Sequence, residues 1–79
     1  MKTQAEVIIE AFKALGGVRS IQEIEQWVVQ QYGEKWKDFG TPMADMVATD
    51  KGGSNSSLIP PEYRVLERVG RGRYKLLKA

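Results

Sequence analysis

Two segments in the first half of the sequence carry the start signals of α-helices, and they constrain the fold more than any other feature. Thr3 and Glu6 form a capping box, in which each side chain satisfies a backbone N–H that the helix leaves unpaired. Ser20 and Glu23 form a second capping box. Glycine follows each segment and readily closes a helix C-terminus. The sequence therefore predicts two helices of about a dozen residues each.

Apolar residues recur at helical spacing in both segments, so each helix should bury one face. The expected inward residues are Ala5, Ile8, Phe12 and Leu15 in the first helix and Ile21, Ile24, Val28 and Tyr32 in the second. The link Val18-Arg19 is long enough only for a bridge strand.

A third helix is predicted after a turn at 34–40. Thr41 is its expected cap and Pro42 its expected first residue, where the missing N–H of proline costs nothing. We expect this helix to bury two methionines and a valine and to fade near Asp50. A polar loop at 52–57 should follow it.

The C-terminal part predicts a β-hairpin. The prolines at 60–61 should forbid a helix directly after the polar loop. Tyr63–Val69 and Arg73–Lys78 are the expected strands, and the turn Gly70-Arg71-Gly72 between them needs positive φ angles. The second strand should have one apolar and one mostly basic face.

This order of elements predicts a single α+β domain over residues 1–79 that is mainly α-helical. Three helices, a short bridge strand and a C-terminal β-hairpin are the parts of a winged helix-turn-helix, in which the hairpin is the wing.

The chain contains neither cysteine nor histidine, so its apolar core, with or without self-association, must hold the fold. The same absences exclude zinc fingers, thiol nucleophiles and imidazole bases. We therefore expect no catalysis, no cofactor and no metal. The first residues contain no apolar stretch long enough for a signal peptide, and no apolar run approaches the roughly 18 residues of a membrane helix. These features favour a soluble, cytoplasmic protein that does not contact membranes.

Positive charge is concentrated near the C-terminus. Residues 64–79 contain six cationic side chains and one carboxylate, whereas residues 1–40 contain five and six respectively. A localised basic patch is typical of a phosphate-binding surface. The candidate nucleic-acid-binding residues are Arg71, Arg73, Lys75, Arg68, Lys51 and Thr49.

Three parts of the sequence resemble the HARE-HTH class of winged helices: 20–24, the Thr41-Pro42 helix start and 68–76. That class occurs beside restriction endonucleases, in chromatin regulators and in a bacterial RNA polymerase subunit. Residues 11–36 are also similar to winged helices associated with restriction enzymes. The most specific part is Val-Gly-Arg-Gly-Arg-Tyr at 69–74. The resemblance implies a winged helix that binds double-stranded DNA in transcription regulation or defence.

The predicted third helix leaves an alternative open. Its outward positions include Asp45 and Asp50 instead of the Arg, Lys, Asn or Gln that read base edges. Either the wing holds DNA with poor base discrimination, or the domain is a protein–protein interaction module without nucleic-acid binding. Trp27 and Trp36 likewise either stack on bases or pack on the core.

Overall fold

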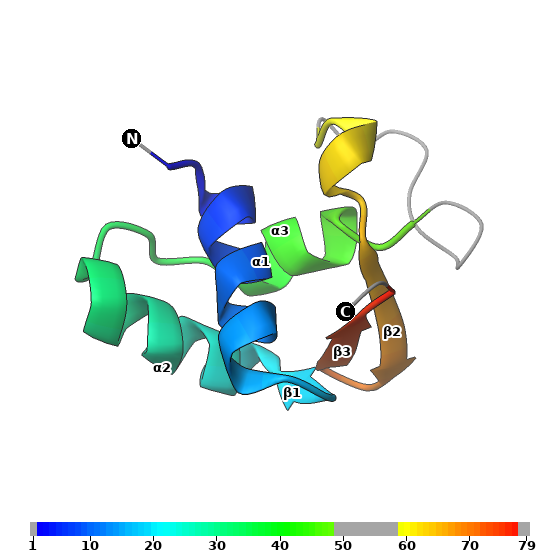
Figure 1. The fold of residues 1–79 in the computed structure, drawn as a ribbon, viewed down its shortest axis with the longest axis horizontal. Coiled ribbons are helices and arrows are strands. Elements are labelled where there is room, and N and C mark those ends of the chain that lie inside the picture. Colours follow the sequence, from blue (N-terminus) through cyan, green and yellow to red (C-terminus); the bar gives the residue numbers. More distant parts are fainter. Residues whose placement is uncertain (1, 49–58, 78–79) are drawn as a thin grey trace.

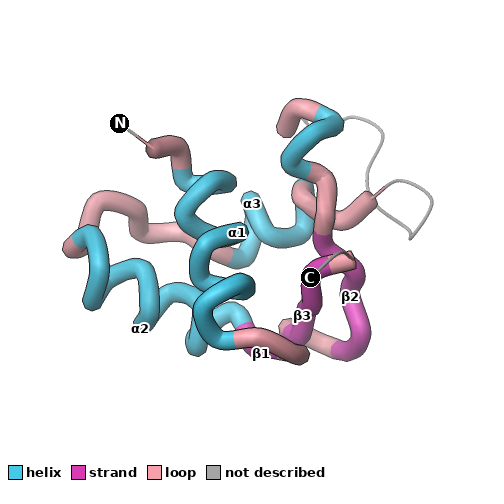
Figure 2. The backbone as a smooth tube through the Cα atoms, in the orientation of Figure 1, coloured by secondary structure: helices cyan, strands magenta, loops and turns pink. Residues whose placement is uncertain are grey.

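The computed structural model describes residues 2–48 and 59–77, which form three α-helices and a three-stranded antiparallel sheet (Figures 1 and 2). The helices are α1 (Gln4–Leu15), α2 (Ile21–Tyr32) and α3 (Gly40–Asp45). The strands are β1 (Arg19–Ser20), β2 (Leu66–Gly70) and β3 (Arg73–Leu76), and a 3₁₀-helix spans Pro61–Tyr63. The expected α+β composition is confirmed. The predicted loop at 52–57 and the candidate residues Thr49 and Lys51 lie outside the described residues.

The starts and ends of α1 and α2 are those that the sequence predicts. The Thr3 hydroxyl oxygen accepts a hydrogen bond from the backbone N–H of Glu6 at 3.3 Å, and that of Ser20 accepts one from the N–H of Glu23 at 3.1 Å. Both glutamates return a hydrogen bond to the cap, so both capping boxes are complete. The glycine after each helix has a positive φ, 72° after α1 and 82° after α2. Local chemistry therefore defines this half of the molecule.

The start of α3 differs from the prediction. The helix begins at Gly40, so Thr41 is not its cap and Pro42 is not its first residue. The cap residue, Phe39, makes no side-chain capping bond. The Asp38 carboxylate accepts the backbone N–H of Thr41 at 3.3 Å instead. An acidic side chain one residue before the cap thus takes the role that the sequence assigned to the threonine.

The predicted end of α3 near Asp50 is also wrong. Leu66 donates its backbone N–H to the carbonyl of Met46 at 3.0 Å, and its carbonyl accepts the N–H of Ala48 at 3.1 Å. These bonds form a parallel bridge between Val47 and Leu66. The chain leaves the helix after Asp45 because its next residues pair with the first residue of β2.

The predicted hairpin is present, with shorter strands. The sheet order is β1-β3-β2, and the register between β2 and β3 shifts between Arg68 and Gly70, which leaves Val69 as an extra residue. The expected positive φ in the turn is found at Gly72, at 68°, and not at Gly70. The bulge adds local twist to the strands on either side of this turn.

The first hairpin strand starts later than predicted because a 3₁₀-helix precedes it. Tyr63 donates its backbone N–H to the carbonyl of Pro60 at 2.9 Å. The inference that the two prolines forbid a helix is wrong, since a proline in the first helical turn has no N–H that needs a partner there. The bridge strand is also displaced by one residue, to Arg19–Ser20.

The core is apolar and draws on all three helices and on the sheet. Its buried side chains are Ala5, Val7, Ile8, Ala11, Phe12, Ile24, Val28, Phe39, Met43, Met46, Val47, Leu66 and Tyr74. Trp27 and Trp36 are half-buried and pack against this core, which favours the packing interpretation of both. Among the described residues, every helix is too short or too polar to cross a membrane.

Candidate nucleic-acid interface

One row across the sheet contains two arginines in contrasting environments. Residues directly opposite one another in antiparallel strands share a face. Tyr74 of β3 pairs with Arg19 on one side and with Arg68 on the other, so all three belong to one face. Tyr74 is 3% exposed, whereas the Arg68 side chain lies in solvent.

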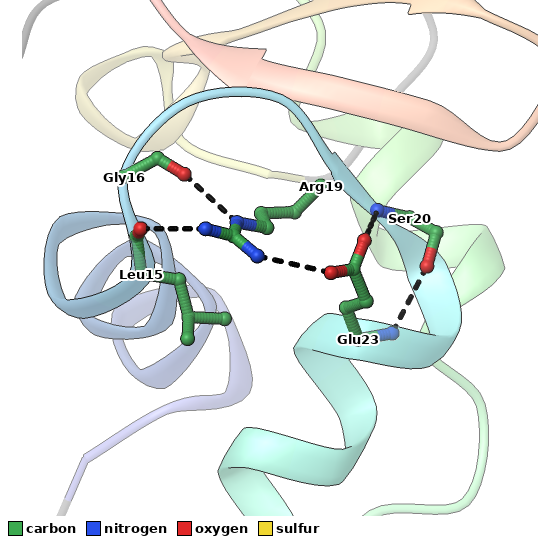
Figure 3. A network of polar contacts seen from close by, with 5 residues as sticks. All are labelled: Leu15, Gly16, Arg19, Ser20 and Glu23. Atoms are coloured by element: carbon green, nitrogen blue, oxygen red, sulfur yellow. Dashed lines mark hydrogen bonds and ion pairs between the residues drawn. The ribbon is translucent and has the colours of Figure 1, made fainter.

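The half-buried Arg19 side chain is engaged in contacts within the chain (Figure 3). Its guanidinium donates to the carbonyl of Gly16 at 2.9 Å, to the carbonyl of Leu15 at 2.8 Å and to the Glu23 carboxylate at 3.0 Å. The two carbonyls are at the C-terminal end of α1, and Glu23 belongs to the capping box of α2. Arg19 therefore joins the end of one helix to the start of the next and is not available to a ligand.

Arg73 lies on the opposite face of β3 with small neighbours on both sides. It pairs with Ser20 on β1 and with Gly70 on β2, so no acidic side chain stands beside it in its row. Arg71 occupies the turn that follows Gly70. Within the described residues, Arg68, Arg71 and Arg73 are exposed and their side chains make no hydrogen bond or ion pair. Three guanidinium groups around the turn end of the hairpin are thus free for an external anion.

The turn itself is fixed to the helical half of the molecule. Ile21 donates its backbone N–H to the carbonyl of Gly72 at 3.1 Å. This bond joins the first residue of α2 to the hairpin turn, and Figure 1 shows the turn beside β1. The arginines therefore project from an anchored segment instead of a long free wing. No pattern in the sequence marks this contact.

Lys75 differs from the predicted arginines. Its Nζ lies 4.0 Å from Oε1 of Glu67, its cross-strand partner on β2, and its side chain is half exposed. It also lies beside Lys13 and Gly16 of the α1 end. The structure therefore groups Arg71 with Arg73 at the turn, puts Arg68 on the other face and pairs Lys75 with a carboxylate.

The described part of α3 supplies no cationic or amide side chain for base reading. No basic residue lies within Gly40–Asp45, and its exposed side chains are those of Thr41 and Ala44. Asp45 is half-buried and engaged in an interaction of its own.

The carboxylates with shifted pKa values serve the helix ends. The backbone N–H of Thr3 and then its hydroxyl lower the pKa of Glu6. The backbone N–H of Ser20 and then the Arg19 guanidinium lower the pKa of Glu23. Hydrogen bonds from Thr41, first from its side chain, lower the pKa of Asp38. All three carboxylates are held in the charged form, which suits capping.

Acidic side chains are otherwise dispersed. In the two described ranges, no group of three or more carboxylates is arranged to hold a metal ion.

The structural role of Arg19 at the junction of α1 and α2 was not among the predictions from the sequence. A signal was present, since Arg19 follows the glycines that end α1 and precedes Glu23 by four residues. A cation at a helix C-terminus binds the last carbonyls, and this spacing allows an ion pair.

Comparisons with protein-family models, with curated proteins and with solved structures give no match. The resemblance to HARE-HTH winged helices accordingly stays a prediction from the sequence.

Proposed function

We propose that this chain is a winged-helix domain that binds double-stranded DNA through Arg68, Arg71 and Arg73. The observation that carries the proposal is that these exposed guanidinium groups have no internal partner among the described residues. Each can therefore meet a phosphate oxygen without first breaking an ion pair. Neutralised phosphates release their condensed counterions, and this release drives binding to a duplex.

The element order supports the winged-helix assignment. Helix, short strand, helix, helix and hairpin follow one another along the chain, and the short strand joins the hairpin in the order β1-β3-β2. The anchored turn holds the arginines beside the start of α2. Less conformational entropy is then lost when they contact DNA.

The proposed mode of binding is contact with the phosphate backbone. Arg68 and Arg73 lie on opposite faces of the hairpin, and Arg71 lies in its turn. Side chains arranged in this way can contact several phosphates more readily than they can contact one row of base edges. Because the described α3 lacks cationic and amide side chains, we expect weak discrimination between DNA sequences.

The test is the salt dependence of duplex binding, measured by fluorescence anisotropy. The logarithm of the binding constant should fall with the logarithm of salt concentration by about 0.9 per phosphate contact. Combined Arg71→Ala and Arg73→Ala substitution should reduce this slope by about 2. Both residues are exposed and unpaired, so the variant should remain folded.

The matched control removes two other exposed cations, Lys35 and Lys37, by substitution with alanine. This variant loses the same charge and should keep the native slope. Equal losses in the two variants would mean that net charge alone attracts the duplex. Absence of native binding at low salt would contradict the proposal.

A protein-interaction module is the second candidate, and the lack of cations on the described α3 favours it. In that case the native chain should not bind a duplex at low ionic strength. Substitution of the exposed Ala44 by arginine should weaken the binding of a protein that docks on α3, whereas it should strengthen the binding of DNA. The sign of the effect distinguishes the two candidates.

A further inference from the structure

The link between α1 and β1 has little packing around it. Gly16 and Gly17 have φ values of 72° and 66°, and a Cβ at either position would meet no atom within 4 Å beyond its chain neighbours. Val18, which completes the link, is 47% exposed. The Arg19 guanidinium donates hydrogen bonds back across the link, to the carbonyls of Leu15 and Gly16. These bonds, more than packing, fix the path of the chain between α1 and β1.

The residues after this link connect it to the hairpin turn. Ser20 pairs with Arg73 of β3. The backbone N–H of Ile21 then bonds the carbonyl of Gly72 at 3.1 Å, which continues the same register by one residue. The position of the turn, and of Arg71 within it, is therefore tied to the position of β1.

Pairing with β3 is by itself a weak anchor for β1. The strand has two residues, whereas strands usually have about five or six, and it lies at the edge of the sheet with one neighbour. Side-chain contacts reinforce it, as Figure 3 shows. One oxygen of the Glu23 carboxylate accepts the backbone N–H of Ser20 at 2.9 Å, and the other accepts the Arg19 guanidinium at 3.0 Å. Both residues of β1 are thus fastened to α2.

We infer that Arg19 is a positioning residue for the hairpin arginines: it holds β1 between the two helices, and β1 holds the turn that presents Arg71 and Arg73. The inference rests on the proposed function, because it concerns how these side chains meet phosphate. Arg19 itself does not contact DNA, since its guanidinium is occupied. A turn that is already ordered loses less conformational entropy on binding. Without Arg19, the glycine link regains its freedom and the turn moves with β1.

The first test needs no DNA. It measures, by NMR, the scalar coupling across the hydrogen bond between the amide nitrogen of Ile21 and the carbonyl carbon of Gly72, and the hydrogen exchange of that amide. Arg19→Ala should weaken the coupling and raise the exchange rate by about tenfold, because the bond opens locally more often. An unchanged coupling and exchange rate would overturn the inference.

The matched control is Thr3→Ala, which removes a capping hydroxyl at the opposite end of α1. It weakens a helix end without touching the link or the turn. The bond between Ile21 and Gly72 should therefore keep its native coupling and exchange rate. An equal effect in Thr3→Ala would mean that lower overall stability loosens the turn, and would overturn a specific role for Arg19.

Glu23→Gln is a milder second variant that separates the ion pair from the cap. Glutamine also serves at this position of a capping box, so the start of α2 should stay intact. The substitution removes the charged partner of Arg19 and should raise the exchange rate of the Ile21 amide by about twofold. This variant decides the question if Arg19→Ala does not fold, and an unchanged rate would then count against the inference.

The decisive test is a double-mutant cycle on duplex binding at low salt. In the native background, Arg19→Ala should lower the affinity by about fivefold and leave the salt slope unchanged, because no phosphate contact is lost. In the background of Arg71→Ala with Arg73→Ala, the same substitution should leave the affinity unchanged. Equal losses in the two backgrounds would overturn the positioning role. A native chain that does not bind a duplex would contradict the proposed function, while the hydrogen-bond measurements would still decide whether Arg19 holds the turn.

Discussion

The two outer strands of the sheet, β1 and β2, each contain an arginine, and the two arginines have opposite roles. Arg19 on β1 and Arg68 on β2 flank Tyr74 in one row, yet the Arg19 side chain makes three polar contacts and the Arg68 side chain makes none within the described residues. Arg19 lies where α1 ends and α2 begins, so unpaired carbonyls and a capping carboxylate surround it. Arg68 lies beside a bulge and a turn, and its side chain has no hydrogen-bond acceptor among the described residues. The fold thus engages the arginine of β1 in internal contacts and leaves the arginine of β2 for a ligand.

The largest expected effect is the loss of stability when each arginine is replaced. Arg19→Ala should lower the free energy of unfolding by about 1–2 kcal/mol, because it removes bonds from a charged donor to two helix-end carbonyls and a carboxylate. Arg68→Ala should change it by less than about 0.5 kcal/mol, as is usual for an exposed side chain without contacts.

Urea unfolding followed by circular dichroism measures both changes. The contrast between the two arginines would be contradicted if Arg68→Ala destabilised the domain as much as Arg19→Ala does. A change in the slope of the unfolding free energy against urea concentration, in either variant, would indicate an altered unfolded state instead.

A smaller effect concerns pH and the partner of Arg19. Glu23 has a pKa below its ordinary value of 4.5, first through the backbone N–H of Ser20 and then through Arg19. The unfolded chain therefore takes up this proton before the folded one does. The stability that Glu23 contributes is complete above about pH 4.5 and is lost as pH falls through the lowered folded pKa.

The measurement is the urea midpoint between neutral pH and pH 3. It should fall below about pH 4.5, and Glu23→Gln should flatten that fall, because glutamine has no proton to gain. Glu25→Gln is the control: it removes a carboxylate of the same helix for which no hydrogen bond or ion pair is found in the described residues. An unchanged pH profile in Glu23→Gln would contradict the assigned role of the capping box.

The sequence predicted the elements whose signals are local. Both capping boxes lie within four residues of chain, and α1 and α2 start where these boxes place them. The end of α3 could not be predicted in this way, because Met46 and Ala48 leave the helix to bond Leu66, about twenty residues further along. A pairing between distant segments leaves no periodic pattern in the sequence.

The same distinction between local signals and distant pairing applies to the residues of the candidate site. The exposure of Arg71 and Arg73 follows from their place at a glycine turn, which the sequence indicates. The face of Arg68 depends on the register, and the bulge at Val69 sets that register relative to Arg73. The pairing of Lys75 with a carboxylate likewise requires the alignment of two strands.

The most direct test of the contrast between bound and free arginines is a titration of their Nε–Hε signals with duplex DNA, followed by NMR. We expect the signals of Arg71 and Arg73 to shift on addition of DNA, while the signal of Arg19, already bound to Gly16 and Glu23, stays in place. Signals of Arg71 and Arg73 that do not respond, or an Arg19 signal that shifts as much as theirs, would contradict the claim that the fold leaves the hairpin arginines free to bind phosphate.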